Sequence, residues 1–178
     1  TGDSLECTTG AGAAAFTLGT KNILAKLIHT VSYSSDTPDF WRRSNQPSPH
    51  HAGRFSGEPA YFQHIMSATH LLLQDLSLHP QDIDHAVFHM PNGKFPQLVS
   101  TRLGFNPGQL QAGFVGPNIG NAYAASSLLG LISVLEQAQP NQTILLTSYG
   151  SGAGSDSFLF QTTKHITTHQ SRHLYEQL

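Results

Sequence analysis

Charged residues are scarce in this chain of 178 residues, and no run of basic residues stands out. Asp, Glu, Lys and Arg make up 11% of the sequence, and the formal net charge is −2. Nucleic-acid binding needs a basic surface that neutralises phosphates, so this class is disfavoured. No apolar run approaches the ~20 residues that span a bilayer, and we find no charged segment followed by an apolar one at the start. We therefore expect neither a nucleic-acid nor a membrane partner.

Cysteine is nearly absent. The single Cys7 excludes an internal disulfide, which fits a reducing cytoplasm. It lies beside an acidic residue inside an expected strand, and this setting disfavours a reactive thiolate. We therefore expect a buried structural thiol. No serine or cysteine stands at an obvious nucleophile turn either, so the chain resembles half of an active site.

Two nucleotide-binding motifs are also missing. The glycines of residues 150–154 are not followed by the Gly-Lys-Ser/Thr of a Walker loop, and residues 10–12 lack the spacing of a dinucleotide fingerprint. We expect no bound cofactor. The pair His50-His51, with His64 and His70 downstream, has no acidic or cysteine partner at ligand spacing, so a zinc site is disfavoured.

A single globular domain is expected from a hydrophobic content of 38% that includes ten Phe. We place this domain at residues 1–164, with a loop insertion at about 34–57 and a polar tail at 165–178. Helices that alternate with short strands predict an α/β layered fold with a mixed sheet. The expected strands are 5–18 and 23–33, paired as a hairpin, then 85–89, a short strand near Phe114, 143–147 and 157–163; the expected helices are 59–78, 92–104 and 122–138.

The helix expected from residue 122 is unusual because residues 122–135 are apolar on nearly every side. Such a helix is buried all round. We expect a partner layer to cover the part that this chain cannot enclose, most simply by self-association.

Three polar groups are candidates for chemistry at the ends of these elements. His89 ends a strand, where α/β folds form ligand crevices, and a neutral imidazole can donate to a carbonyl oxygen or move a proton. Asn121 precedes the apolar helix, where its amide could stabilise an oxyanion or simply cap the helix. The glycine-rich turn at 150–154 could expose N–H groups to an oxyanion or serve only as a turn. Eleven histidines in the chain leave a packing role open for His89 as well.

Several segments, in this order, resemble the C-terminal half of 3-hydroxy-3-methylglutaryl-CoA (HMG-CoA) synthase of the archaeal and bacterial type, a member of the thiolase superfamily. They are Ser35-Asp-Thr-Pro-Asp-Phe-Trp-Arg-Arg43, Gly53-Arg-Phe-Ser-Gly-Glu-Pro-Ala-Tyr61, residues 88–96, Gly120-Asn-Ala-Tyr123 and residues 148–158. The resemblance runs from about Leu5 to Thr163. It implies half of an αβαβα sandwich with a mixed five-stranded sheet, in which the all-apolar helix is the central buried one.

The resemblance also implies chemistry. In that family acetyl-CoA acylates a cysteine, a glutamate removes a proton from the acetyl group, and the carbanion attacks the ketone of acetoacetyl-CoA before hydrolysis. This reaction feeds the mevalonate route to isoprenoids. His89 matches the histidine that polarises the acetoacetyl group, Asn121 the asparagine beside it, and Ser151 the residue whose N–H completes the oxyanion hole. The candidate substrate and CoA contacts are Lys94, Phe40, Trp41, Tyr123 and Gly150.

The cysteine and glutamate of that family lie in an N-terminal half that this sequence does not include, and Cys7 does not match the cysteine. We therefore expect the chain to be inactive alone, as either a fragment or a natural subunit that joins an N-terminal thiolase-like half. Two alternatives stay open: half of a ketoacyl synthase III-like condensing enzyme, and a non-catalytic module that binds acyl-CoA. A cytoplasmic homo-oligomer is expected in each case.

Overall fold

Helices and strands alternate through a layered α/β domain in the computed structural model, which describes residues 7–152, 154–168 and 174. The strands are β1 (Ala25–Ser34), β2 (Phe40–Trp41), β3 (His50–His51), β4 (His85–Phe88), β5 (Thr143–Thr147) and β6 (Gly154–Thr162). The helices are α1 (Phe62–Asp75), α2 (Phe95–Leu103), α3 (Pro107–Gln111), α4 (Gly116–Ile119) and α5 (Ser126–Leu135). The expected α/β class is confirmed.

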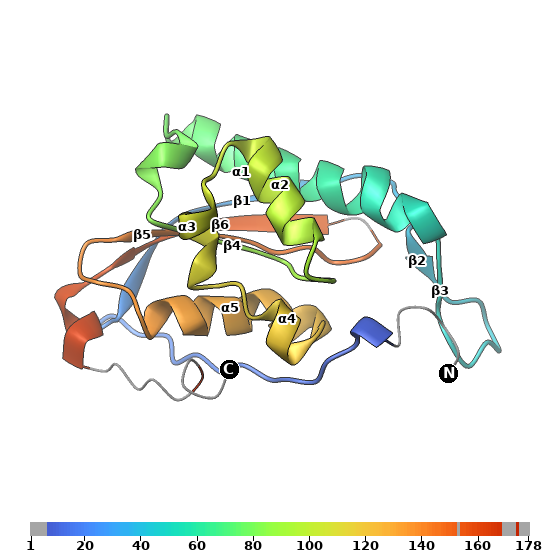
Figure 1. The fold of residues 1–178 in the computed structure, drawn as a ribbon, viewed down its shortest axis with the longest axis horizontal. Coiled ribbons are helices and arrows are strands. Elements are labelled where there is room, and N and C mark those ends of the chain that lie inside the picture. Colours follow the sequence, from blue (N-terminus) through green and yellow to red (C-terminus); the bar gives the residue numbers. More distant parts are fainter. Residues whose placement is uncertain (1–6, 153, 169–173, 175–178) are drawn as a thin grey trace.

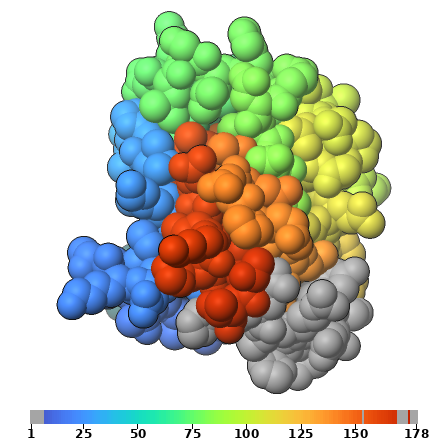
Figure 2. Space-filling view, turned by 90° about the vertical axis from the view of Figure 1, so that its left-hand side faces the viewer, coloured from blue at the N-terminus to red at the C-terminus, as the bar shows by residue number. Residues whose placement is uncertain are grey.

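The main sheet is mixed. Within the described residues it has four strands in the order β1-β6-β5-β4, one fewer than the five-stranded sheet that the resemblance implies. β4 and β5 are parallel, whereas β6 pairs antiparallel with both β5 and β1. The first and last strands of the chain therefore lie side by side, and Figure 2 shows the blue early residues against the red late ones on this face. β2 and β3 form a separate two-stranded hairpin.

Helices cover both faces of the sheet (Figure 1). α1 packs on β1, β5 and β6, and α2 lies beside it on the same side. α5 lies on the opposite face against β4 and β5. The apolar residues of α1 explain its place, since Phe62, Ile65 and Leu72 are all buried at helical spacing. No helix among the described residues has the length and apolar character needed to cross a bilayer.

Asn92 and Gly104 flank α2 as the sequence predicted, although the helix itself begins at Phe95, with Lys94 as its N-cap. The side-chain oxygen of Asn92 accepts the main-chain N–H groups of Lys94 and Phe95, each at 2.9 Å. Gly104 ends the helix in the left-handed region at φ 85°, which a residue without Cβ adopts at little cost. The expected strands at 85–89 and 143–147 are also confirmed, as β4 and β5.

The central helix α5 is buried, as expected, over most of its length. Seven of its ten residues are buried and the remainder are partly covered. Part of the cover comes from the N-terminal segment: a Cβ at Gly12 would lie 2.7 Å from the side chain of Leu129, and Ala14 packs in the same cluster. The chain itself therefore encloses more of this helix than the sequence suggested. The helix starts at Ser126, after a 3₁₀ turn, and not at residue 122.

Gly130 brings α5 into close contact with the sheet. A Cβ at this position would lie 2.7 Å from Val87 and 2.8 Å from the main-chain oxygen of Gly113. We expect Gly130→Val to lower the free energy of unfolding by about 1 to 3 kcal/mol, because the backbone oxygen cannot move aside cheaply. Urea denaturation measures this, with Gly19→Val as the control because a Cβ there meets nothing within 4 Å. Equal stability of the two variants would contradict the close approach.

The expected strand at 5–18 and its hairpin with the next strand are wrong over the described residues. Residues 10–19 have no regular secondary structure, and a single bridge joins Thr9 to Asn121. The small residues that favour a strand here pack instead on α4 and α5, where Gly10 lies against the main chain of Ile119. Strand propensity alone names no pairing partner, which is why the prediction failed. Residues 5 and 6 lie outside the described residues.

The expected strand near Phe114 is also wrong. The main-chain N–H groups of Phe114 and Val115 donate to Gln111 and Gly113, so they make turns and no ladder. A Cβ at Gly113 would lie 2.7 Å from the side chain of Val87. This close packing against β4 takes the place of strand pairing. The strand expected at 157–163 exists but begins earlier, at Gly154, and the helix expected at 59–78 is α1 preceded by a turn at Gly57–Tyr61.

The loop expected at 34–57 is largely irregular, as predicted, although it carries the short hairpin of β2 and β3. Of the polar tail, Lys164–Thr168 forms a 3₁₀ turn. Residues 169–173 and 175–178 lie outside the described residues.

Candidate active site

The carboxyl ends of β4 and β5 meet at one edge of the sheet because the two strands are parallel. His89 directly follows β4, and its main-chain N–H donates to the Thr147 oxygen at 3.0 Å. The glycine-rich turn begins three residues after Thr147. Ligand crevices of α/β folds form at this edge, so the topology brings two of the three predicted groups to the expected place.

The His89 side chain is 8% exposed. Burial lowers its pKa from the ordinary 6.5 to about 4, since the protonated ring would lose its hydration. The imidazole is therefore neutral at pH 7. Within the described residues no hydrogen bond engages either ring nitrogen. Such a ring can donate to or accept from a substrate oxygen.

This pKa shift links His89 to the pH dependence of stability. Because the folded state holds the ring below its ordinary pKa, the unfolded chain binds the extra proton between pH 6.5 and 4, and stability falls as the pH falls through that window. We expect this residue to cost roughly 2 to 3 kcal/mol between pH 7 and 4.5. The loss should be smaller in His89→Gln and unchanged in a control, His70→Gln, whose ring is exposed. Urea melts at both pH values measure it; identical losses in all three proteins would contradict the shift.

Asn121 lies ahead of the 3₁₀ turn Tyr123–Ala125 that leads into α5, and its side chain closes a local turn. Its side-chain oxygen accepts the main-chain N–H of Tyr123 at 2.8 Å. Its own main chain pairs with the N-terminal segment: its N–H donates to Thr8 and its oxygen accepts from Gly10. The capping role that the sequence left open is not present, since α5 has no side-chain cap at its start. The amide NH₂ has no hydrogen-bond partner among the described residues and can still donate to a substrate.

The turn that contains Ser151 is closed by its own backbone. Gly150 and Gly154 exchange two hydrogen bonds, at 2.8 and 3.2 Å. Gly150, at its base, and Ser151 are both exposed. An exposed N–H in a short closed turn can serve an oxyanion.

A buried carboxylate that the sequence analysis missed holds this turn. Asp39 is 1% exposed, and its two oxygens accept from the Tyr149 hydroxyl and from the Gly152 N–H, each at 2.6 Å. Asp39 lies in one of the segments that carry the resemblance, but its partners lie more than 100 positions away. No local pattern could have paired them.

Tyr149 lies between His89 and the turn that contains Ser151. Its ring contacts the rings of Tyr61, His64 and His89 at centroid distances of 5.7, 5.6 and 6.3 Å. Burial, followed by the hydrogen bond and charge of Asp39, raises its pKa far above the ordinary value, so the phenol keeps its proton. Tyr61 in turn donates its hydroxyl to the main-chain oxygen of His89 at 2.7 Å.

The predicted substrate and CoA contacts are more dispersed. Lys94 is exposed just before α2, and Tyr123 is 51% exposed after Asn121. Phe40 and Trp41 form β2, where their rings lie beside those of β3 at 5.8 and 6.4 Å. No hydrogen bond or ring contact among the described residues joins these four side chains to His89.

Of the four histidines between residues 50 and 70, His64 is held in the core. His64 is fully buried, with its ring nitrogens hydrogen-bonded to Ser35 and to the main chain of Ala60. The described residues contain no group of three His, Cys, Asp or Glu side chains placed to hold a metal. Cys7 is exposed, so the prediction of a buried thiol is wrong. It failed because the strand expected to bury it does not form.

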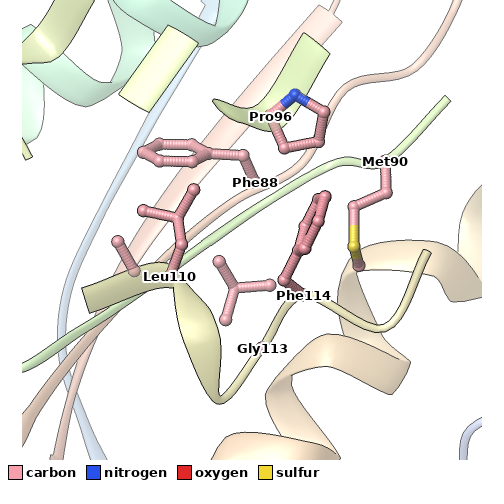
Figure 3. Close-up of a pocket in the computed structure, with 8 residues that line it drawn as sticks. Phe88, Met90, Pro96, Leu110, Gly113 and Phe114 are labelled. Carbon is pink, nitrogen blue, oxygen red and sulfur yellow. The ribbon is translucent and has the colours of Figure 1, made fainter. Parts of the chain in front are cut away.

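Two hollows are lined by residues of β4, α2, α3 and the segments beside them, and neither is lined by the predicted residues. The first is closed by packed side chains, and Figure 3 shows Phe88, Leu110 and Phe114 converging there. The second is an open groove of about 480 Å³ between α2 and α3. His89 and Ser151 lie at the edge of the sheet, outside both hollows.

Comparison with known families shows which family the chain belongs to. The family described as 3-oxoacyl-[acyl-carrier-protein (ACP)] synthase III C terminal matches residues 73–162, or 90 of the 178 residues. This range includes β4, α5, β5 and β6. The chain belongs to this family.

Curated relatives agree with the resemblance seen in the sequence. Hydroxymethylglutaryl-CoA synthase of Methanopyrus kandleri is 53% identical over 165 residues, which are 93% of this chain and 47% of the relative. The enzymes of the same name from Archaeoglobus fulgidus and Methanosphaera stadtmanae are 50% and 49% identical, with 93% of this chain and 48% of each relative covered. The chain thus spans about half the length of the curated relatives it matches.

Solved structures confirm the thiolase-like fold. An HMG-CoA synthase complexed with CoA superposes with a TM-score of 0.74 at 24% identity, covering 86% of this chain and 43% of that one. A 3-oxoacyl-(acyl carrier protein) synthase III from Pseudomonas aeruginosa superposes with a TM-score of 0.68 at 18% identity, covering 78% and 44%. Both superpositions use less than half of the larger protein.

Proposed function

We propose that this chain is the C-terminal half of an HMG-CoA synthase-like enzyme that condenses acetyl-CoA with acetoacetyl-CoA. The observation that carries the proposal is the neutral, nearly buried His89 with free ring nitrogens, in a chain 53% identical to one half of an enzyme of that name. The cysteine nucleophile and glutamate base belong to an N-terminal half. The chain alone is inactive.

Each of the three groups has a role in this reaction. The neutral His89 donates a hydrogen bond to the ketone oxygen of the acetoacetyl group, which accepts negative charge as the new carbon–carbon bond forms. The Asn121 amide donates beside it. The Ser151 N–H, at the tip of its turn, stabilises the oxyanion of the acyl-cysteine. Lys94 suits a CoA phosphate, and Phe40, Trp41, Tyr123 and Gly150 complete the substrate contacts. No resident cofactor is required.

Reconstitution tests this function. The chain is assembled with its N-terminal half, and CoA release from acetyl-CoA and acetoacetyl-CoA is followed with a thiol reagent. We expect turnover by the assembled protein and none by either half alone. Turnover by this chain alone would contradict the division of labour. A stable assembly that binds acyl-CoA without condensing it would favour a non-catalytic binding module.

A second function follows from the family match itself, because the matched family is named for 3-oxoacyl-ACP synthase III. In that case the acceptor is carried on acyl carrier protein. The two functions separate in the same assay when acetoacetyl-CoA is replaced by an acyl carrier protein substrate. We expect the CoA-bound acceptor to react faster, since the curated relatives near 50% identity are HMG-CoA synthases.

Association with further copies in the cytoplasm is part of the proposal. Several large apolar side chains are exposed early in the chain, among them Leu18 at 92% and Leu27 at 53%. A surface of this kind favours association. Sizing chromatography of the assembled enzyme should show more than one copy of each half, and a 1:1 assembly would contradict it.

A further inference from the structure

The hydrogen-bonded pairing of β4 with β5 ends at His89, the residue whose imidazole must be positioned. β4 ends at Phe88, and the His89 N–H makes the last bond to β5, with Thr147. Its carbonyl oxygen accepts from the Tyr61 hydroxyl at 2.7 Å. The Tyr61 hydroxyl therefore holds the main chain at the point where the hydrogen bonds of the sheet end.

The following residue is held from the opposite face. The Met90 N–H donates to the Ser126 hydroxyl at 3.2 Å, and that hydroxyl in turn faces the Met90 oxygen at 3.4 Å. Tyr61 precedes α1 on one face of the sheet, whereas Ser126 opens α5 on the other. The two peptide units after β4 are thus held between two helical elements.

No described hydrogen bond reaches the His89 ring itself, so the ring depends on its main chain and on packing for its direction. Packing comes from Tyr149, whose ring lies 6.3 Å from the imidazole. Tyr61 supports that ring too, edge to face at 5.7 Å. Tyr61 is 1% exposed, and burial raises its pKa well above the ordinary value, so its hydroxyl is a donor at every working pH.

We propose that Tyr61 is a positioning residue for His89: it fixes the peptide that follows β4 and thereby aims the imidazole at the substrate oxygen. The proposal deepens the function proposed above and rests on it. A hydroxyl that fixes a catalytic main chain acts on the step that needs the ring, because a small misplacement there is costly. Steps that do not use His89 should be spared.

The test uses Tyr61→Phe in the assembled enzyme, with Tyr33→Phe as the matched control. The Tyr33 hydroxyl accepts from Gln63 at 3.0 Å and has no bond to His89. We expect Tyr61→Phe to lower kcat for condensation about tenfold, with little change in KM, while acetylation of the cysteine stays at the control's rate. A purely structural role would slow both steps together.

Two results overturn the proposal: condensation by Tyr61→Phe that equals the Tyr33→Phe control, or condensation and acetylation that fall in parallel. If Tyr61→Phe does not fold, Ser126→Ala removes the support from the other face and is judged by the same split between the two steps.

A readout independent of turnover separates this proposal from the proposed function. The ring resonances of isotope-labelled His89 are identified by their loss in His89→Ala. We expect them to move in Tyr61→Phe and to stay in place in Tyr33→Phe. If the assembled parent does not condense its substrates, the proposed function fails, and the resonances alone decide the positioning: shifted resonances support it and unmoved resonances overturn it.

Discussion

His89→Ala in the assembled enzyme should reduce condensation about 1,000-fold, within the range that a positioned acid or base contributes. The reason is specific to this ring: burial keeps it neutral, with a pKa of about 4, and leaves its nitrogens free for a substrate oxygen. Without it, the alkoxide that forms from the ketone loses its imidazole donor. Single-turnover mixing of the acetylated enzyme with acetoacetyl-CoA measures this step directly.

Acetylation of the cysteine in the same variant should stay within a few-fold of the parent, because that step uses the oxyanion turn and not His89. His70→Ala serves as the control, since its ring is exposed on α1. Equal loss of acetylation and condensation in His89→Ala would instead point to collapse of the sheet edge. Unchanged condensation would remove His89 from the reaction.

Asp39→Ala should slow acetylation of the cysteine and spare the condensation step, the opposite of His89→Ala. Its carboxylate fixes both ends of a short segment, the Tyr149 hydroxyl and the Gly152 N–H, at 2.6 Å each. Loss of these bonds frees the turn that presents the Ser151 N–H. Because loss of one oxyanion donor costs about 100-fold or more, we expect acetylation of the cysteine to slow roughly 100-fold.

The control for this change is Asp36→Ala, three residues earlier in the same loop and exposed to solvent. It removes an equal charge without touching the turn. Radiolabel transfer from acetyl-CoA to the cysteine, followed over time, measures the rate. Normal acetylation in Asp39→Ala would show that the turn keeps its shape without the carboxylate, and a fall matched by Asp36→Ala would indicate a general charge effect.

The two substitutions together divide the edge into parts with different tasks. His89 follows β4 and serves the second substrate, whereas the turn after β5 serves the acyl group. Tyr149 contacts both, since its ring faces His89 and its hydroxyl meets Asp39. The double variant should lose both steps. If Tyr149 couples the two parts, its loss of transition-state stabilisation should exceed the sum of the losses in the two single variants.

Sequence patterns were sufficient where structure depends on nearby residues. The start and stop of α2 follow from Asn92 and Gly104, a side-chain cap and a left-handed terminator that act within one helical turn. β5 follows from a compact β-branched and leucine run. The place of His89 at a strand end followed in the same way, because a buried strand and the turn after it are both local.

Tertiary structure alone decided matters that depend on distant partners. Residues 7–18 have a strand's composition, yet they pack on α4 and α5 and pair only at Thr9. Asp39 meets its partners across 110 positions or more, and Tyr61 meets His89 across 28. Hydrogen-bond partners and burial are properties of the packed chain, so a sequence can name the residues able to do this chemistry, and only the fold selects the groups that hold them in place.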